Sequence, residues 1–272
     1  MSPSFRFERR PELRAPVLVV AFQGWIDAGM AGAGAVSLLA NQLPAARHFA
    51  SLDLEDDLDS SQTRPQVRLR PDGSRRIDWP AVELMAGRHG PDVVVATGPE
   101  PSLRWQWFAS EVVAVAQDLG VTRAFLLGGL PVPVSHRRST EVRTSVSGRP
   151  EAVGISRLDY RGPTGAQTVV QHALGTAGIP AVALWAEVPN YVSGSPCPPA
   201  MRALLLALRE YGALDVETGD LDELCDSYRE RLEDQLTGRP EITALVEALD
   251  NAPDLPSGDE LAAEIERYLR GK

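Results

Sequence analysis

Residues 17–29 read VLVVAFQGWIDAG, and residues 30–42 read MAGAGAVSLLANQ. The first six residues are apolar and rich in β-branched side chains, which is typical of a strand buried on both faces. Residues 23–29 contain two glycines and predict a loop. The small apolar residues of 30–42 predict a helix that packs closely against its neighbours. Residues 17–42 therefore predict a strand, a glycine-containing loop and a helix, in that order.

The same order recurs further along the chain. Three more apolar runs predict buried strands at 92–97, 123–128 and 180–186. Helices are expected after them, at 103–119, 165–177 and 199–211, with Ser102 as a candidate cap of the first. Strands that alternate with helices predict a mixed, largely parallel sheet covered by helices on both faces.

The loops that follow the four apolar strands are expected to meet. Carboxyl ends of parallel strands share one edge of a sheet, and ligands bind there in α/β proteins. The loops concerned are 23–29, 98–102, 129–137 and 187–194. Further strands are expected at 47–54, 66–70 and 141–146, and Asp72-Gly73 predicts a hairpin turn.

Composition limits the class of protein. The chain has 272 residues, of which 43% are hydrophobic and 24% charged, enough for one large domain or two small ones. No apolar run approaches the ~20 residues that span a bilayer, and residues 1–14 lack an apolar signal core. The two cysteines, Cys197 and Cys225, predict no disulfide framework. We therefore expect a soluble, cytoplasmic protein.

The net charge of −10 is unevenly distributed. Residues 213–272 contain 17 Asp and Glu against 6 Lys and Arg, whereas residues 1–212 are nearly neutral. This balance argues against binding to nucleic acid or to an anionic membrane surface. Helices are expected at 218–236, 241–250 and 258–270. We predict an α/β domain over 1–212 and an acidic helical extension over 213–272 that packs on it.

Familiar catalytic motifs are absent from the sequence. It has no P-loop, zinc-protease or nucleophile-elbow motif. Gly29, Gly32 and Gly34 lack the order of a dinucleotide-binding loop and predict close helix–sheet packing instead. The acidic stretch 53–59 has the oxygen ligands of a Mg²⁺ or Ca²⁺ site but not the spacing, so a solvated loop is the default. We predict no metal and no cofactor.

Polar and aromatic residues in the four loops are nevertheless candidates for a site. Asp27 can bind a cation or orient a base, although an aspartate at this place more often caps a helix. Glu100 lies between two prolines that hold a rigid turn and can hydrogen-bond a ligand. An aromatic–arginine set follows it and either stacks a flat ring or anchors a protein interface. The candidate ligand-pocket or interface residues are Trp25, Asp27, Glu100, Arg104, Trp105, His136, Arg137, Glu187 and Tyr191.

We predict no catalytic residue among these candidates. His136 and Arg137 together can bind an anion, but a histidine without a placed nucleophile is weak support for catalysis. We expect Trp105 and Trp107 to be buried, either in a pocket wall or between subunits.

Several segments, taken in order, resemble the PAC2 family, which is named for a proteasome assembly chaperone. They include FQGWIDAG at 22–29, GPEP at 98–101, His136-Arg137, and LWAEVPNY at 184–191. The resemblance covers about residues 15–212 and is greatest for the actinobacterial branch. It implies a three-layer α/β/α sandwich of the phosphorylase/hydrolase type and a homo-oligomer, for which we take a trimer as a working assumption. Eukaryotic and archaeal members assist assembly of the proteasome core.

Two functions follow from these observations. The first is a non-catalytic assembly chaperone or scaffold that binds itself and a protein client. The second is a small-molecule enzyme or binding protein for a nucleoside-like or anionic ligand. A concave pocket lined by the candidate residues favours the second, whereas a flat or filled rim favours the first.

Overall fold

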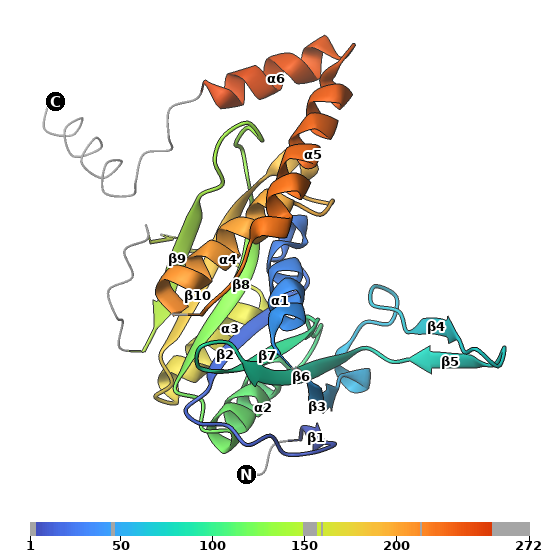
Figure 1. Ribbon diagram of the computed structural model, residues 1–272, viewed down its shortest axis with the longest axis vertical. Helices are drawn as coiled ribbons and strands as arrows, with labels where there is room; N and C mark the ends of the chain where they lie inside the picture. Colours follow the sequence, from blue (N-terminus) through green and yellow to red (C-terminus); the bar gives the residue numbers. More distant parts are fainter. Residues whose placement is uncertain (1–3, 45–46, 149–156, 159, 213, 252–272) are drawn as a thin grey trace, which may run out of the picture.

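A computed structural model of the chain describes residues 4–44, 47–148, 157–158, 160–212 and 214–251 (Figure 1). One sheet contains eight strands: β1 (Arg6–Phe7), β2 (Val17–Gln23), β3 (Arg47–Asp53), β6 (Ala81–Arg88), β7 (Asp92–Pro99), β8 (Arg123–Val132), β9 (Val142–Ser147) and β10 (Ala181–Pro189). Their spatial order is β1-β3-β6-β7-β2-β8-β10-β9.

The centre of the sheet consists of the four strands that the apolar runs predict. β7, β2, β8 and β10 lie side by side and are parallel, which confirms the prediction that they are neighbours. Both flanks are antiparallel: β6, β3 and β1 extend the sheet beyond β7, and β9 pairs with β10. The carboxyl ends of the four central strands therefore face one rim.

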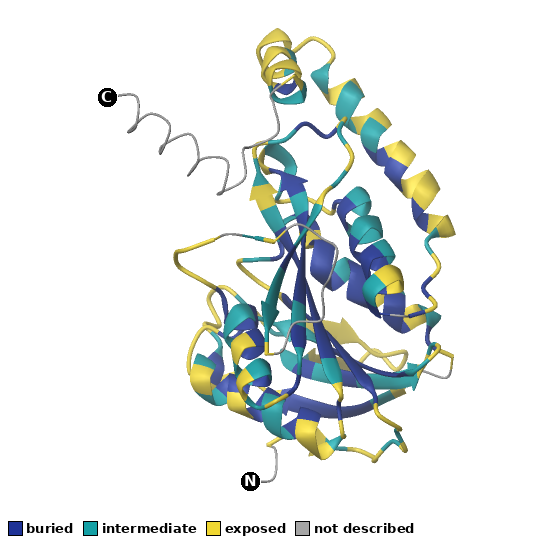
Figure 2. Cartoon of the chain, turned by 90° about the vertical axis from the view of Figure 1, so that its left-hand side faces the viewer, coloured by how far each residue is buried: buried dark blue, intermediate teal, exposed yellow. Residues whose placement is uncertain are grey.

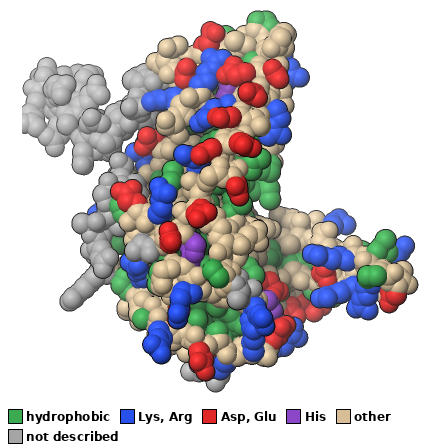
Figure 3. Space-filling model, viewed as in Figure 1, with side chains coloured by type: hydrophobic (Ala, Val, Ile, Leu, Met, Phe, Trp, Pro, Cys, Tyr) green, Lys and Arg blue, Asp and Glu red, His purple; other side chains and the backbone are tan. Residues whose placement is uncertain are grey.

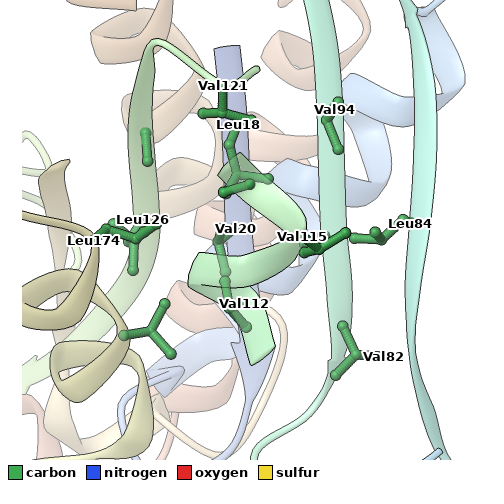
Figure 4. Packing of buried hydrophobic residues seen from close by; sticks show 14 of the residues in the cluster. Leu18, Val20, Val82, Leu84, Val94, Val112, Val115, Val121, Leu126 and Leu174 are labelled. Atoms are coloured by element: carbon green, nitrogen blue, oxygen red, sulfur yellow. The ribbon is translucent and has the colours of Figure 1, made fainter. Parts of the chain in front are cut away.

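Two pairs of helices cover the two faces of the sheet. α2 (Trp105–Asp118) and α3 (Ala166–Thr176) pack on one face, where Val112 and Val115 of α2 belong to the same apolar cluster as Leu18 and Val20 of β2 (Figure 4). α1 (Ala31–Gln42) and α4 (Pro198–Gly212) pack on the other face. Each interface is a separate apolar cluster, and the predicted three-layer α/β/α sandwich is confirmed.

The structure differs from the sequence-based expectations at three elements, of which the two-residue strand β1 was not predicted. β6 was not predicted; its buried Val82 and Leu84 alternate with more exposed residues. α2 begins at Trp105 rather than at 103. Ser102 does not cap it, because the Ser102 hydroxyl accepts a hydrogen bond from the Asp59 N–H at 3.0 Å.

A two-stranded hairpin projects from the body of the molecule (Figure 1). β4 (Gln66–Leu69) and β5 (Arg75–Asp78) form a separate antiparallel sheet. The turn between them is the predicted one: Gly73 has φ +81°, and the Asp72 carboxylate accepts hydrogen bonds from Ser74 N–H (2.8 Å) and Oγ–H (2.6 Å). Glycine is needed there because other residues rarely adopt a positive φ.

The C-terminal part consists of α5 (Gly219–Leu236) and α6 (Pro240–Asp250). α5 lies along the body with its inner side buried and its outer side exposed (Figure 2). Leu221 and Tyr228 join the apolar cluster of α1 and α4, and Arg202 of α4 pairs with Asp222 at 2.6 Å. The helix expected at 258–270 lies outside the described residues, and the domain boundary at 212 stays a prediction. Within the described chain, every helix falls short of the length and apolarity of a membrane span.

Candidate functional site

The rim at the carboxyl ends of the central strands carries all nine candidate residues, and the structure divides them into two groups. Trp25, Asp27, Glu100, Arg104 and Trp105 follow the neighbouring strands β2 and β7. His136, Arg137, Glu187 and Tyr191 lie at the ends of the neighbouring strands β8 and β10. Glu187 is bonded to Arg143 and Tyr191 to His136. Glu100 is bonded to the backbone of Trp25 and Ala166.

Glu100 joins three segments by backbone hydrogen bonds. Its carboxylate accepts from the Trp25 N–H at 2.8 Å and from the Ala166 N–H at 2.6 Å. Ala166 is the first residue of α3 and follows a glycine, so Glu100 supplies the acceptor that this helix start lacks. Gly24 and Gly165 pack directly against the carboxylate, where a Cβ atom would collide with it. The Trp25 side chain is 62% exposed.

Asp27 caps α1, as the commoner interpretation of this position predicts. Its carboxylate accepts a hydrogen bond from the Gly32 N–H at 2.7 Å and lies 3.4 Å from the Ala33 nitrogen. Burial raises the pKa of Asp27 to about 6, and the bonds from Gly32 and Ala33 oppose that rise. Gly32 packs against the carbonyl of Leu127, which confirms close helix–sheet packing at this glycine.

Arg104 and Trp105 are held by contacts around the start of α2. The Arg104 guanidinium forms a two-point ion pair with the buried carboxylate of Asp57, at 2.6 and 2.7 Å, and lies 4.6 Å from the ring centre of Trp107. Trp105 Nε1 donates to the Pro101 carbonyl at 2.6 Å. Trp105 and Trp107 are half-buried. Asp57, from the acidic stretch, therefore binds an arginine of its own chain.

His136 and Arg137 bind the helix α5. His136 Nδ1 lies 2.7 Å from the Tyr191 hydroxyl, and Nε2 lies 3.0 Å from a carboxylate oxygen of Glu233. The His136 N–H also donates to the Tyr191 oxygen at 2.8 Å. These contacts are satisfied together when the Tyr191 O–H donates to Nδ1 and Nε2–H donates to Glu233.

Arg137 completes this group with a two-point ion pair to Glu233, at 2.6 and 2.8 Å. The Arg137 guanidinium lowers the pKa of Glu233 to about 2, with a smaller contribution from His136. The same carboxylate raises the pKa of Arg137. Burial raises the pKa of the Tyr191 hydroxyl. The histidine and arginine that can bind an anion are thus already bound to a carboxylate of this chain.

Glu187 is paired within the sheet. Its carboxylate accepts from Arg143 Nε of β9 at 2.8 Å. Between Glu187, His136, Cys197 and Tyr228 lies a cavity of ≈20 Å³. A cavity of this size holds about one water molecule, whereas ligand pockets occupy about 300–1,000 Å³.

Gln167, which was not among the candidates, closes the gap between β2 and β8. The two strands are paired from Val17 to Val20 and are not paired beyond it. Gln167 is buried there; its oxygen accepts from the Phe22 N–H at 3.1 Å and its amide donates to the Leu127 carbonyl at 2.9 Å. Further out, the Gly129 N–H donates to the Ile26 carbonyl at 3.0 Å. A gap between diverging central strands is where a ligand would enter, and here side chain and backbone occupy it.

The sequence contains a pattern that could have identified Gln167 as a residue of the rim. It contains no such pattern for Glu233. Gln167, Val170, Gln171 and Leu174 follow the spacing of one helix face, so two glutamines lie where apolar residues are expected. Glu233 is one of many acidic residues of α5 and has no distinguishing pattern.

The polar side chains of the rim are bonded to other groups of the same chain. Its carboxylates cap helices or pair with arginines, and its histidine is hydrogen-bonded at both ring nitrogens. Across the described residues, no three His, Cys, Asp or Glu side chains are grouped as a metal ion requires. These features define a three-layer α/β/α protein whose strand-end rim is closed by internal hydrogen bonds and ion pairs.

Comparison with known proteins identifies the family. Residues 21–236 match the PAC2 family model, and the chain belongs to the PAC2 family. A PAC2 family protein from Streptomyces avermitilis is 36% identical; the match covers 85% of this chain and 99% of that one, with a TM-score of 0.78.

Two further solved structures are similar over most of their length. A proteasome-assembly chaperone homologue from Mycobacterium tuberculosis is 34% identical, with a TM-score of 0.75 and coverage of 85% of this chain and 99% of that one. A protein of unknown function from Corynebacterium glutamicum is 27% identical, with a TM-score of 0.81 and coverage of 97% and 99%. A comparison with curated proteins found no match.

Proposed function

We propose that this protein is a non-catalytic assembly chaperone that acts as a homo-oligomer on a protein client. The observation that carries the proposal is the filled gap between β2 and β8. Gln167 bonds both strands there. A catalytic site needs side chains that are free to meet a substrate, and the groups at this rim are engaged with one another.

The family relation indicates the kind of client. The Mycobacterium tuberculosis relative, 34% identical, is named a proteasome-assembly chaperone homologue. We therefore propose a proteasome subunit as the client. Cys197 and Cys225 are both buried and unpaired, which supports action in a reducing compartment such as the cytoplasm.

The test uses the purified full chain and unassembled proteasome subunits from the same organism. We expect a complex of defined stoichiometry in native mass spectrometry, and a higher yield of assembled particles when the protein is present. Serum albumin at the same concentration is the control for crowding. Absence of a complex together with an unchanged yield would contradict the proposed client.

The proposal that the protein is not an enzyme is tested separately, by thermal denaturation in the presence of nucleosides, nucleotides and phosphate. A ligand that binds only the folded state raises its apparent stability. We expect an unchanged Tm with each compound. A rise that saturates with concentration would instead support the small-molecule alternative.

A further inference from the structure

The side chain of Trp25 differs from the other candidate residues of the rim. Asp27 and Glu100 bond backbone N–H groups, and His136 bonds Tyr191. The Trp25 indole is 62% exposed, and no hydrogen bond, ring contact or cation–π contact joins it to any residue that the structure describes. Tryptophan is enriched among the residues that dominate the binding energy of protein interfaces. An exposed tryptophan at this place is therefore a candidate anchor for a partner.

The backbone that carries Trp25 is held by hydrogen bonds on both sides of the residue. The Trp25 N–H donates to Glu100 at 2.8 Å, and the Asp27 N–H donates to the Gly24 carbonyl at 3.3 Å. The Ile26 carbonyl accepts from the next strand, as described above. A loop that is ordered beforehand loses little conformational freedom when a partner binds. The fold therefore presents the indole at a defined place on the rim.

Two further exposed apolar side chains lie on the segments that bond with the Trp25 loop. Leu103 is 57% exposed and follows β7, the neighbour of β2 in the sheet. Tyr160 is 56% exposed and precedes α3, whose first residue, Ala166, bonds the same Glu100 carboxylate as Trp25. We define the rim patch as Trp25, Leu103 and Tyr160. Exposed apolar side chains that are grouped in this way mark protein interaction sites.

The rim patch differs in charge from the other regions that expose large apolar residues. Red side chains gather over α5 and blue ones on the β4–β5 hairpin in Figure 3. Residues 22–30 and 98–103, by contrast, contain two charged residues, Asp27 and Glu100, and both bond backbone N–H groups. These two loops therefore offer a partner apolar side chains, with their own charges already engaged.

The size of the rim patch is that of a transient contact. Aromatic side chains bury about 150–250 Å² each, so three large side chains that are a little more than half exposed offer roughly 300–400 Å². A stable interface buries about 800 Å² on each partner. The patch is therefore too small to hold a second copy of this chain by itself. It is large enough for a client that is bound and later released.

We propose that the client docks on the rim patch, through apolar side chains that an unassembled proteasome subunit exposes and that the assembled particle buries. Interfaces between permanently associated subunits are more hydrophobic than the rest of a protein surface, so an unassembled subunit carries such faces. Trp25 is the anchor of the contact, and Leu103 and Tyr160 extend it. This inference rests on the proposed function and specifies the surface that performs it.

The test measures Kd between the full chain and unassembled proteasome subunits from the same organism. Trp25→Ala is expected to raise Kd at least about tenfold, because it removes the anchor. Trp25→Phe is expected to raise Kd by a smaller factor, because the phenyl ring keeps part of the apolar area. Leu103→Ala is expected to have an effect between that of the wild type and that of Trp25→Ala.

The chain offers a matched control for each of these positions. Trp79, between β5 and β6, is 54% exposed, and Leu224, on α5, is 51% exposed. Trp79→Ala and Leu224→Ala remove the same kinds of side chain elsewhere on the surface and are expected to leave Kd unchanged. Circular dichroism and sedimentation velocity verify that every variant keeps the fold and the mass of the wild type.

Salt and the state of assembly provide two more readouts. The Debye length falls from about 10 Å at 0.1 M salt to about 3 Å at 1 M. A contact made by the acidic α5 or by the basic hairpin weakens over this range, whereas binding at the rim patch is expected to persist. The assembled proteasome core should bind at least about tenfold more weakly than its unassembled subunits, because its apolar faces are covered.

The outcomes separate this inference from the proposed function. Absence of a complex with the wild type would overturn both. A complex whose Kd is the same for Trp25→Ala and the wild type would overturn the rim patch alone. The rim patch would also be overturned by equal effects of Trp25→Ala and Trp79→Ala, by loss of binding at high salt, or by equal binding of assembled and unassembled subunits.

Discussion

Arg137, in the loop after β8, and Glu233, on α5, form a two-point ion pair across 96 positions of sequence, with N–O distances of 2.6 and 2.8 Å. His136 contacts the same carboxylate. The pair joins the strand-end rim to the C-terminal helix. His136 and Arg137 therefore hold an acidic helix against this part of the rim.

Replacing Glu233 by glutamine is expected to loosen α5 without unfolding the body. The pair is partly exposed, so the loss of stability is expected to be at most about 1 kcal/mol. Hydrogen exchange of the α5 amides should accelerate, while exchange in β2 and β8 stays unchanged. Gln235→Ala, an exposed change on the same helix, is the control. Unchanged exchange in Glu233→Gln would show that α5 is held by apolar contacts alone.

The same pair predicts a pH dependence. The pKa of Glu233 is about 2 in the folded protein, below its ordinary value, so the ionised carboxylate favours folding. This contribution is complete above about pH 4.5 and is lost as the pH falls toward 2. The difference in stability between wild type and Glu233→Gln should therefore shrink in acid.

Asp27 predicts the opposite dependence. Its pKa rises from 3.8 to about 6 on folding, so the folded state holds a proton that the unfolded state has released, and stability falls as the pH rises from 3.8 to about 6. In Asp27→Asn the amide oxygen still accepts from Gly32, and we expect this fall to disappear. At pH 7 the variant should equal or exceed the wild type in urea denaturation. Asp27→Ala, which also removes the cap, should lose about 1–2 kcal/mol.

Glu100 is expected to be a stabilising residue. Glu100→Ala removes the acceptor of the Trp25 and Ala166 N–H groups and should lower the free energy of unfolding by about 1–3 kcal/mol. In Glu100→Gln the single amide oxygen can serve only one of the two donors, so an intermediate loss is expected. Glu12→Ala, at an exposed position, is the matched control. Equal stability of Glu100→Ala and the control would contradict a stabilising role for Glu100 and would make it a candidate ligand-binding residue again.

Substitution of Gln167 is expected to lower the stability of the protein more than substitution of a glutamine on a helix usually does. Gln167→Leu keeps the volume but leaves the Phe22 N–H and the Leu127 carbonyl without a partner, which should cost about 2 kcal/mol or more. Urea denaturation measures this loss, and Gln106→Leu, an exposed glutamine on α2, is the control. A neutral Gln167→Leu would mean that water replaces the amide between the strands.

The central sheet was predictable because its strands are buried on both faces. Each of the four runs contains at least four consecutive apolar residues, which is typical of a strand buried on both faces, and pairing of parallel strands then brings their loops to one rim. β6 was missed although β3 and β9, which also lie on the antiparallel flanks, were predicted. Its sequence, AVELMAGR, mixes apolar residues with helix-forming ones and has no continuous run.

The sequence correctly placed the candidate residues at the rim, but it did not predict which groups they bind. Glu100 binds backbone N–H groups and Arg137 binds a carboxylate on α5, and neither kind of partner is visible in a local pattern. A side chain's partner is set by which distant segments pack together. Polar loop residues therefore predicted a location correctly, while their chemistry depended on tertiary contacts.

The closure of the β2–β8 gap by Gln167 has a consequence for the protein in the cell. The Phe22 N–H and the Leu127 carbonyl are paired within the chain, so a newly synthesised copy can complete this part of the sheet before it meets any metabolite.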